Sequence, residues 1–194
     1  MQVDLISITP DSITLIEKAG RTCYDSEKEN PEIIKRFIDS KHTSTIEHGS
    51  ASFRVKGVSR ALMAQLTRHR IASYSIRSQR YVDENNFEYV MPNSICQEPE
   101  AHRIYTDCME TIRTAYKELR GLNIPKEDSR YVLPNSCTVE LVVTMNFRSW
   151  RNFFELRCDK TAQWEIRYMA NSMLQILNDH NTYVFGDLAE QFLK

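Results

Sequence analysis

Hydrophobic and polar positions alternate strictly in several short stretches of the chain. Residues 51–56 place Ala51, Phe53 and Val55 between polar neighbours, which is the period of two that marks a half-buried strand. Residues 137–147 repeat this pattern, with four apolar side chains on one face. Further strands are expected at residues 2–8, 78–82 and 87–91, with a polar turn at 83–86 between the last two.

Apolar residues recur at helical spacing between these strands. The longest such stretch predicts an amphipathic helix over residues 98–119 that ends at Gly121. Its inner face is expected to carry Ile104, Cys108, Ile112, Ala115 and Leu119. Shorter helices are expected after Pro10, Asn30, Ser59 and Pro125, and over residues 148–157 and 161–178. Gly20 is expected to end the first helix.

Strands and helices therefore mix without a regular βαβ alternation, which predicts the α+β class. We expect a single catalytic domain over residues 1–194, with a mixed or antiparallel sheet packed by several helices. The sequence contains neither GxGxxG nor GxxxxGK[ST]. A bound nucleotide is therefore not expected to be held by a Rossmann fingerprint or a P-loop.

Composition narrows the possible partners. The 25 basic and 26 acidic residues nearly cancel, so no global charge favours nucleic acid or an anionic membrane. No apolar run approaches the roughly 18 residues of a membrane span, and the first residues lack the pattern of a signal peptide. The five cysteines have no CxxC spacing. We therefore expect reduced thiols in a cytoplasmic protein, and neither a disulfide framework nor a metal site.

The charge is distributed unevenly along the chain. No acidic residue lies between Glu47 and Asp83, a stretch that carries Arg54, Lys56, Arg60, Arg68, Arg70, Arg77 and Arg80. Such a stretch favours an anionic ligand. The alternative is a solvated basic face whose acidic partners come from elsewhere in the fold.

Residues 65–81 combine groups that suit a phosphate and a ring. Paired guanidinium groups bind phosphate through parallel charge-assisted hydrogen bonds. Ser78 adds a hydroxyl donor, and Tyr74 and Tyr81 are suited to stacking. The alternative from another functional class is therefore a nucleic-acid-binding module. It would use Arg68, Arg70, Arg77 and Arg80 for phosphates and the two tyrosines for stacking.

The order Arg68-His69-Arg70, seven residues, Ser78 resembles the signature of flavin-dependent thymidylate synthases. Three further elements of that family are matched in order, and together they cover most of the chain from Cys23 to Ile166. They are residues 42–48 (HTSTIEH), residues 129–134 (SRYVLP) and residues 146–166, which include Asn146, Arg148, Asn152 and Arg157.

The resemblance implies the reductive methylation of dUMP to dTMP. Methylenetetrahydrofolate would supply the carbon, FAD would relay hydride and NADPH would reduce the flavin, in a homotetramer with shared active sites. The residues that the resemblance assigns to FAD are Ser44, Arg68, His69, Arg70, Asn146, Arg148 and Asn152. Those that it assigns to dUMP are Gln65, Arg68, Arg77, Ser78, Gln79, Arg80 and Arg130. Arg157 would face the uracil ring as the catalytic residue.

One position departs from the family pattern. Ile76 stands where the family commonly has Glu or Gln two residues before the motif serine. A contact with FAD or dUMP there would have to come from the backbone of Ile76.

Arg148 and Arg157 are nine residues apart, which puts them on opposite faces of a continuous helix. We therefore expect that both serve catalysis only if the helix breaks or if an oligomer uses both faces. A thymidylate synthase with a cysteine nucleophile is a third possibility, but no cysteine lies in that family's sequence context.

Overall fold

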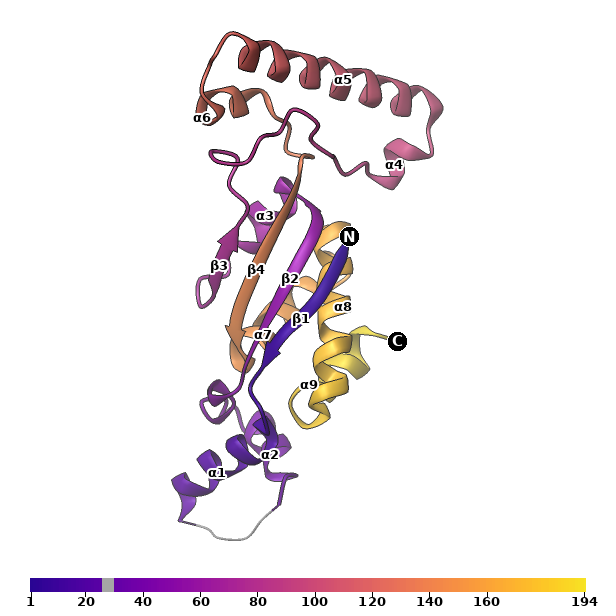
Figure 1. Ribbon diagram of the computed structural model, residues 1–194. Coiled ribbons are helices and arrows are strands. Elements are labelled where there is room, and N and C mark those ends of the chain that lie inside the picture. Colours follow the sequence, from indigo (N-terminus) through magenta and orange to yellow (C-terminus); the bar gives the residue numbers. More distant parts are fainter. Residues whose placement is uncertain (26–29) are drawn as a thin grey trace. The chain divides into compact units, whose positions relative to one another are not determined.

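The computed structural model describes residues 1–25 and 30–194. Within them, strands β1 to β4 form a sheet in the order β1-β2-β4-β3, with neighbouring strands antiparallel (Figure 1). The strands are β1 (Gln2–Ile8), β2 (Ser50–Ser59), β3 (Ser73–Ile76) and β4 (Thr138–Asn146). The predicted α+β class is confirmed.

The chain forms two compact units. The first comprises residues 1–55, 65–75 and 142–194, and the second comprises residues 56–64 and 76–141. Among the described residues no helix combines the length and the apolar character needed to cross a bilayer.

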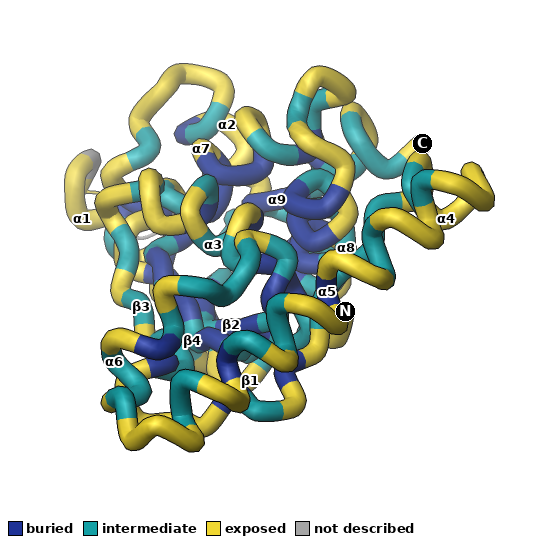
Figure 2. Tube along the Cα trace, turned by 90° about the horizontal axis from the view of Figure 1, so that it is seen from above, coloured by how far each residue is buried: buried dark blue, intermediate teal, exposed yellow. Residues whose placement is uncertain are grey.

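The helices of the first unit cover one face of the strands (Figure 1). They include α7 (Phe147–Arg157), α8 (Trp164–His180) and α9 (Thr182–Phe192). The segment between β1 and β2 carries α1 (Ser12–Tyr24), α2 (Ile33–Asp39) and the short 3-10 helix η1 (Thr45–His48). Figure 2 shows buried residues along α7, α8 and α9, with exposed residues on the outer turns.

Aromatic packing attaches α7 to the sheet in this unit. Trp150 is fully buried, meets Phe53 of β2 edge-on at 5.3 Å between ring centroids, and stacks on Phe154 at 5.7 Å. Its indole Nε1 donates a hydrogen bond to the carbonyl of Ala51 at 3.1 Å. Because these rings occupy one face of α7, the exposed polar residues Arg148, Asn152 and Glu155 are left on the opposite side of the helix.

The second unit is built around the long helix α5 (Pro99–Gly121). Its other elements are α3 (Arg60–Leu66), whose last two residues belong to the first unit, α4 (Asn93–Cys96), α6 (Lys126–Ser129) and the 3-10 helix η2 (Arg130–Val132). Phe87, Met109 and Cys137 form its buried cluster. The Ser59 hydroxyl accepts from the Leu62 amide at 3.0 Å, so the helix start predicted at Ser59 is confirmed.

The inner face of α5 differs from the expected one. Ile104 is 55% exposed and Cys108 is exposed, whereas Met109 and Tyr116 are buried. The observed inner stripe is Tyr105, Met109, Ile112 and Tyr116, which shares Ile112 with the predicted one. The larger side chains of this stripe bury more surface, and they turn it inward in place of the stripe predicted from Ile104.

The strands predicted at residues 78–82 and 87–91 are wrong. The carbonyl of Ser78 accepts from the amides of Tyr81 and Val82, and the Ser78 hydroxyl accepts from the Arg80 amide, so local bonds fold this stretch into a turn. In the other stretch only Tyr89 forms an antiparallel bridge, with Cys137. The strand lies earlier, at β3, where none was predicted.

Gly20 does not end α1, which continues to Tyr24. A Cβ atom built on Gly20 would overlap the ring of Phe37 in α2. The glycine therefore permits a close approach of two helices and does not act as a terminator.

We expect Gly20→Ala to lower the free energy of unfolding by about 1–2 kcal/mol. The overlap with Phe37 outweighs the roughly 1 kcal/mol by which alanine favours a helix over glycine. Urea unfolding followed by circular dichroism measures the change. Gly121→Ala is the matched control, because a Cβ there meets nothing within 4 Å. Equal stability of the two variants would contradict this account of Gly20.

Candidate functional site

An open cavity of about 810 Å³ in the first unit gathers most of the residues predicted to hold FAD. Its size falls within the range of small-molecule sites. The lining residues are Glu47, Arg68, His69, Arg70, Ile71, Met145, Asn146, Arg148, Ser149, Asn152, Leu156 and Arg157.

The end of β4 and the first turns of α7 form one wall of the cavity. Asn146 is the last residue of β4, and its side-chain oxygen accepts from the Ser149 amide at 2.8 Å, which caps α7. The cap fixes where the helix starts. Arg148 and Asn152, one turn apart, consequently lie on the same side of α7 and both line the cavity.

The segment that follows α3 forms another wall. The Tyr74 hydroxyl lies 2.8 Å from the Leu66 carbonyl and 2.9 Å from the His69 carbonyl and donates its hydrogen between them. Burial raises the pKa of Tyr74 to about 12, so the hydroxyl keeps this hydrogen. The tyrosine therefore fixes the turn that carries Arg68 and Arg70.

The positive charge of the cavity is only partly neutralised. Arg148 Nη1 lies 2.6 Å from Glu47 Oε1 in an exposed ion pair. The side chains of Arg68 and Arg70 are exposed and make no hydrogen bond or ion pair with any described residue. Two uncompensated guanidinium groups at a cavity of this size favour an anionic ligand.

Arg157 and His69 are hydrogen-bonded to each other at this cavity. Arg157 Nε donates to His69 Nε2 at 3.0 Å, and Nη2 makes a longer contact of 3.4 Å with the carbonyl of Gln65. The His69 ring also meets Phe153 edge-on at 5.0 Å. Burial, together with the charge of Arg157, lowers the pKa of His69 from 6.5 to about 4. His69 is therefore neutral at pH 7.

Arg148 and Arg157 line the same cavity although α7 is continuous between them. We expected Arg148 and Arg157 to serve catalysis together only if the helix breaks or if an oligomer uses both faces. That expectation is wrong, because both arginines reach one cavity from a continuous helix. Arg157 is the last residue of α7, and its long side chain extends to His69. The homotetramer remains a prediction that rests on the family resemblance alone.

Eight predicted residues of the site do not line this cavity, namely Ser44, Gln65, Ile76, Arg77, Ser78, Gln79, Arg80 and Arg130. Ser44 is exposed just before η1. Gln65 contributes its backbone carbonyl as an acceptor for Arg157. Ile76 is the last residue of β3 and is half-buried in the second unit.

The predicted phosphate ligands of the second unit have partners there. Arg77 binds both carboxylate oxygens of the buried Glu84, at 2.8 and 3.0 Å. Arg80 Nε lies 2.6 Å from the carboxylate of Glu127, whose carbonyl accepts from Arg130 Nε at 3.0 Å. Arg77 and Arg80 thus fit the alternative explanation of the basic stretch, in which the acids come from elsewhere in the fold.

Two further residues of that segment are placed by local contacts. Gln79 is buried, and its amide contacts the Cys137 sulfur at 3.5 Å. The Ser78 hydroxyl accepts from the Arg80 amide at 3.2 Å. These local contacts define the turn from Ser78 to Arg80.

Sequence reasoning missed several lining residues of the cavity, namely Glu47, Ile71, Met145, Ser149 and Leu156. Ser149 had a usable signal, because it stands three residues after a capping asparagine. Ile71 is 75% exposed and Leu156 is 56% exposed, and no periodicity distinguishes such apolar residues at a site from ordinary surface ones.

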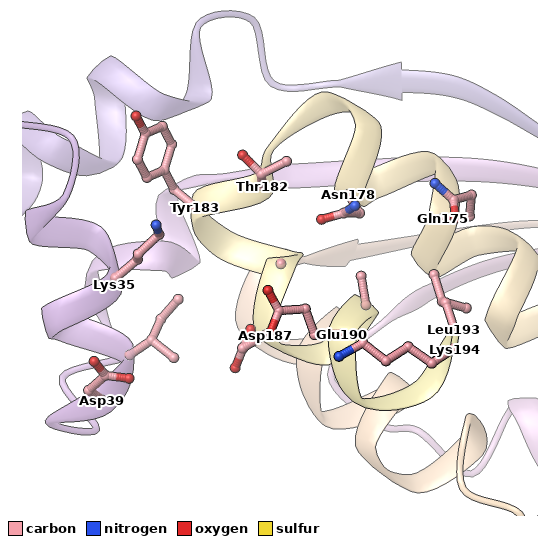
Figure 3. A pocket seen from close by; sticks show the side chains of 13 residues that line it. Lys35, Asp39, Gln175, Asn178, Thr182, Tyr183, Asp187, Glu190, Leu193 and Lys194 are labelled. Atoms are coloured by element: carbon pink, nitrogen blue, oxygen red, sulfur yellow. The ribbon is translucent and has the colours of Figure 1, made fainter.

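A second cavity of about 660 Å³ lies between α2, α8 and α9 (Figure 3). Lys35 and Asp39 approach it from α2, and Asp187 and Glu190 approach it from α9. Asp187 already binds Arg151 through both carboxylate oxygens at 2.6 Å. The second cavity therefore carries charges of both signs, some of them already paired. The first cavity is the stronger candidate for an anionic ligand.

Comparison with known proteins gives consistent matches. A family model described as "thymidylate synthase complementing protein" matches residues 4–180. A flavin-dependent thymidylate synthase of Nitratidesulfovibrio vulgaris is 39% identical, over 92% of this chain and 82% of the relative. One of Geobacter sulfurreducens is 38% identical, over 96% and 86%. The crystal structure of thymidylate synthase X from Helicobacter pylori with FAD and dUMP has a TM-score of 0.81 at 28% identity, covering 97% of this chain and 98% of that one.

The lowered pKa of His69 gives a stability change with a defined sign. Between pH 4 and 6.5 the unfolded chain binds more protons at this residue than the folded protein does. The free energy of unfolding should therefore rise with pH across this window and fall as the pH drops through it. We expect His69→Gln to weaken this dependence in urea unfolding of the full-length protein at a series of pH values. An unchanged slope would assign the acid sensitivity to other groups.

Proposed function

Because the chain belongs to the family of flavin-dependent thymidylate synthases, we propose that it methylates dUMP to dTMP with FAD as its cofactor. The observation that carries the proposal is the cavity where Arg68, His69 and Arg70 meet the polar side of α7.

The cavity fits a flavin nucleotide. Arg68 and Arg70, whose guanidinium groups have no partner among residues 1–25 and 30–194, are available for its phosphates. The exposed side chains of Ile71 and Leu156 offer apolar surface for its ring system, and Asn152 offers an amide. Arg68, His69, Arg70, Asn146, Arg148 and Asn152 would hold FAD, with Ser44 beside η1. When bound, FAD supplies the hydride, and the protein supplies position and charge.

The phosphate of dUMP is the expected ligand of Ser78, Gln79, Arg80 and Arg130, together with Gln65 and Arg68. Arg80 and Arg130 support this assignment because both contact Glu127, one at its carboxylate and one at its carbonyl. A phosphate carries more charge than a carboxylate and replaces it at a guanidinium. Arg77 is better explained as a partner of the buried Glu84 than as a ligand. At Ile76 a contact would come from the backbone.

Arg157 would stabilise the negative charge that develops on the uracil ring. A guanidinium remains protonated and so stabilises an N3-deprotonated, enolate-like ring without transferring a proton. Neutral His69 orients Arg157 by accepting a hydrogen bond from Arg157 Nε. Ser78 is not expected to act as a nucleophile, because its neighbours Arg77 and Arg80 stay protonated and cannot remove its hydroxyl proton. It is expected to act as a ligand.

The remaining parts of the proposal rest on the family resemblance. Methylenetetrahydrofolate would be the carbon donor and NADPH the reductant, in a homotetramer with shared active sites. The family match over residues 4–180 includes parts of both compact units, which supports a single catalytic domain. All five cysteines are free, as expected for a cytoplasmic protein.

Both alternative functions have specific observations against them. Two of the arginines available to a nucleic-acid module, Arg77 and Arg80, are paired with Glu84 and Glu127. A cysteine nucleophile needs a thiolate. Burial raises the pKa of Cys137 to about 11 and that of Cys158 to about 12, so both thiols stay protonated at neutral pH. The exposed Cys23, Cys96 and Cys108 do not line the candidate cavity.

We expect the purified protein to bind FAD and its flavin absorbance to bleach when NADPH is added without oxygen. Arg70→Ala should weaken FAD binding by about tenfold, the effect of losing one charged hydrogen-bond donor. Calorimetry measures the affinity, with Arg103→Ala on the exposed side of α5 as the control. Protein that binds no FAD in calorimetry would refute the proposed function.

We expect Glu127→Gln to tighten dUMP binding by roughly twofold to fivefold, because the substrate phosphate no longer competes with a carboxylate for Arg80. Glu100→Gln should leave the affinity unchanged, because it alters an exposed ion pair with Arg103 in another helix, α5. Equilibrium binding of dUMP to the FAD-loaded protein measures both. Weaker binding in Glu127→Gln would show that this carboxylate supports the substrate site.

A further inference from the structure

Arg157 differs in the charge of its partner from three arginines near the two proposed sites that form ion pairs. Arg148 binds Glu47, Arg77 binds Glu84, and Arg80 binds Glu127, each a carboxylate. Among the described residues, Arg157 instead has an imidazole nitrogen and a backbone carbonyl as its partners. Its side chain is therefore oriented by neutral groups.

The two acceptors lie along one edge of the guanidinium. Nε carries one hydrogen and each Nη carries two, all in a rigid plane. Nε–H and one hydrogen of Nη2 point along the same edge, and they face His69 Nε2 at 3.0 Å and the Gln65 carbonyl at 3.4 Å. Both hydrogens of Nη1 and the second hydrogen of Nη2 remain for a ligand at the cavity that Arg157 lines.

His69 is itself held in place on two sides. Its ring packs edge-on against Phe153 at 5.0 Å, and its backbone carbonyl receives the Tyr74 hydroxyl at 2.9 Å. Because Nε2 accepts from Arg157, the ring proton must be on Nδ1. Partial burial and the nearby guanidinium lower the pKa of His69 to about 4, so this acceptor persists at neutral pH.

A neutral acceptor has a consequence that a carboxylate would not have. A carboxylate at this distance would orient the guanidinium but would also compensate its charge. An imidazole lone pair orients the group and leaves its charge available to an electron-rich ring.

We propose that His69 is a positioning residue, whose Nε2 holds Arg157 Nε and directs the free hydrogens of the guanidinium towards the pyrimidine of the substrate. The proposal rests on the proposed function for the identity of that substrate. The His69–Arg157 contact itself does not depend on it.

The tautomer of His69 tests the contact without any assay of activity. Long-range ¹H–¹⁵N spectra of the full-length, ¹⁵N-histidine-labelled protein at pH 7, with and without FAD, should show an unprotonated Nε2 and a protonated Nδ1. The signal is assigned by its loss in His69→Gln. A protonated Nε2 would overturn the proposal, because such a nitrogen cannot accept from Arg157.

Two substitutions separate orientation from simple packing. In His69→Gln the amide oxygen falls near the place of Nε2, whereas in His69→Asn the side chain is too short to reach Arg157. At saturating FAD and dUMP, His69→Asn should lose about tenfold or more in kcat, and His69→Gln should stay within roughly threefold of the wild type. The KM for dUMP should change little in either. His102→Asn, an exposed histidine of α5, is the control.

Arg157→Lys puts a methylene group in the place of the Nε donor, so adding His69→Asn to it should cause no further loss of kcat. Equal kcat in His69→Asn and the wild type, or equally low kcat in His69→Gln and His69→Asn, would overturn the positioning role. A wild-type protein that forms no dTMP would instead refute the proposed function. The tautomer would then decide whether His69 orients Arg157.

Discussion

The packing of the aromatic face of α7 against β2 is the constraint on which the site depends. Trp150 lies between Phe53 and Phe154 and is bonded to the backbone at Ala51. A rotation of α7 would remove these rings from the core, which close packing makes unfavourable. The same orientation presents Arg148 and Asn152 to the cavity, so the apolar core sets the direction of the polar groups.

Charge is arranged differently in the two compact units. In the second unit, Arg77 and Arg80 have carboxylate partners that keep a turn in place. In the first unit, Arg68 and Arg70 have no such partners among the described residues. Unpaired cations repel one another and are tolerated only where water or a ligand solvates them. The acidic partners of Arg77 and Arg80 lie in the second unit, which explains how a chain of net charge −1 has a locally positive cavity in the first.

The sequence was informative where one strong period had no competitor. Buried and less buried positions alternate without interruption from Val139 to Met145, and β4 forms there as predicted. On α5 two apolar stripes competed, and periodicity alone could not show that Tyr105 and Met109 would face inward. The turn at Ser78 depends on local side-chain bonds that override strand propensity. Helix α9 was not predicted, although Asn181 caps it and Val184, Phe185 and Leu188 mark its buried face.

The candidate site was predicted mostly through resemblance, and the contacts that define it were not. The motif arginines and the residues of α7 were named from their order in the chain. The hydrogen bond between His69 and Arg157 joins segments 88 residues apart, and no local pattern encodes it. Arg148 and Arg157 were assigned to opposite faces because helical geometry describes where a side chain starts and not how far an arginine extends.

The buried Arg151 of α7 depends on the carboxyl-terminal helix α9 for its partners. Both Nη atoms of Arg151 bind the carboxylate of Asp187, and Nη1 also donates to the Val184 carbonyl. Helix α9 lies beyond residue 180, where the family match ends. A chain shortened at that point would leave a guanidinium in the core without its counter-ion, on the helix that carries Arg148 and Arg157. Residues beyond the family match therefore stabilise the helix that carries Arg148 and Arg157.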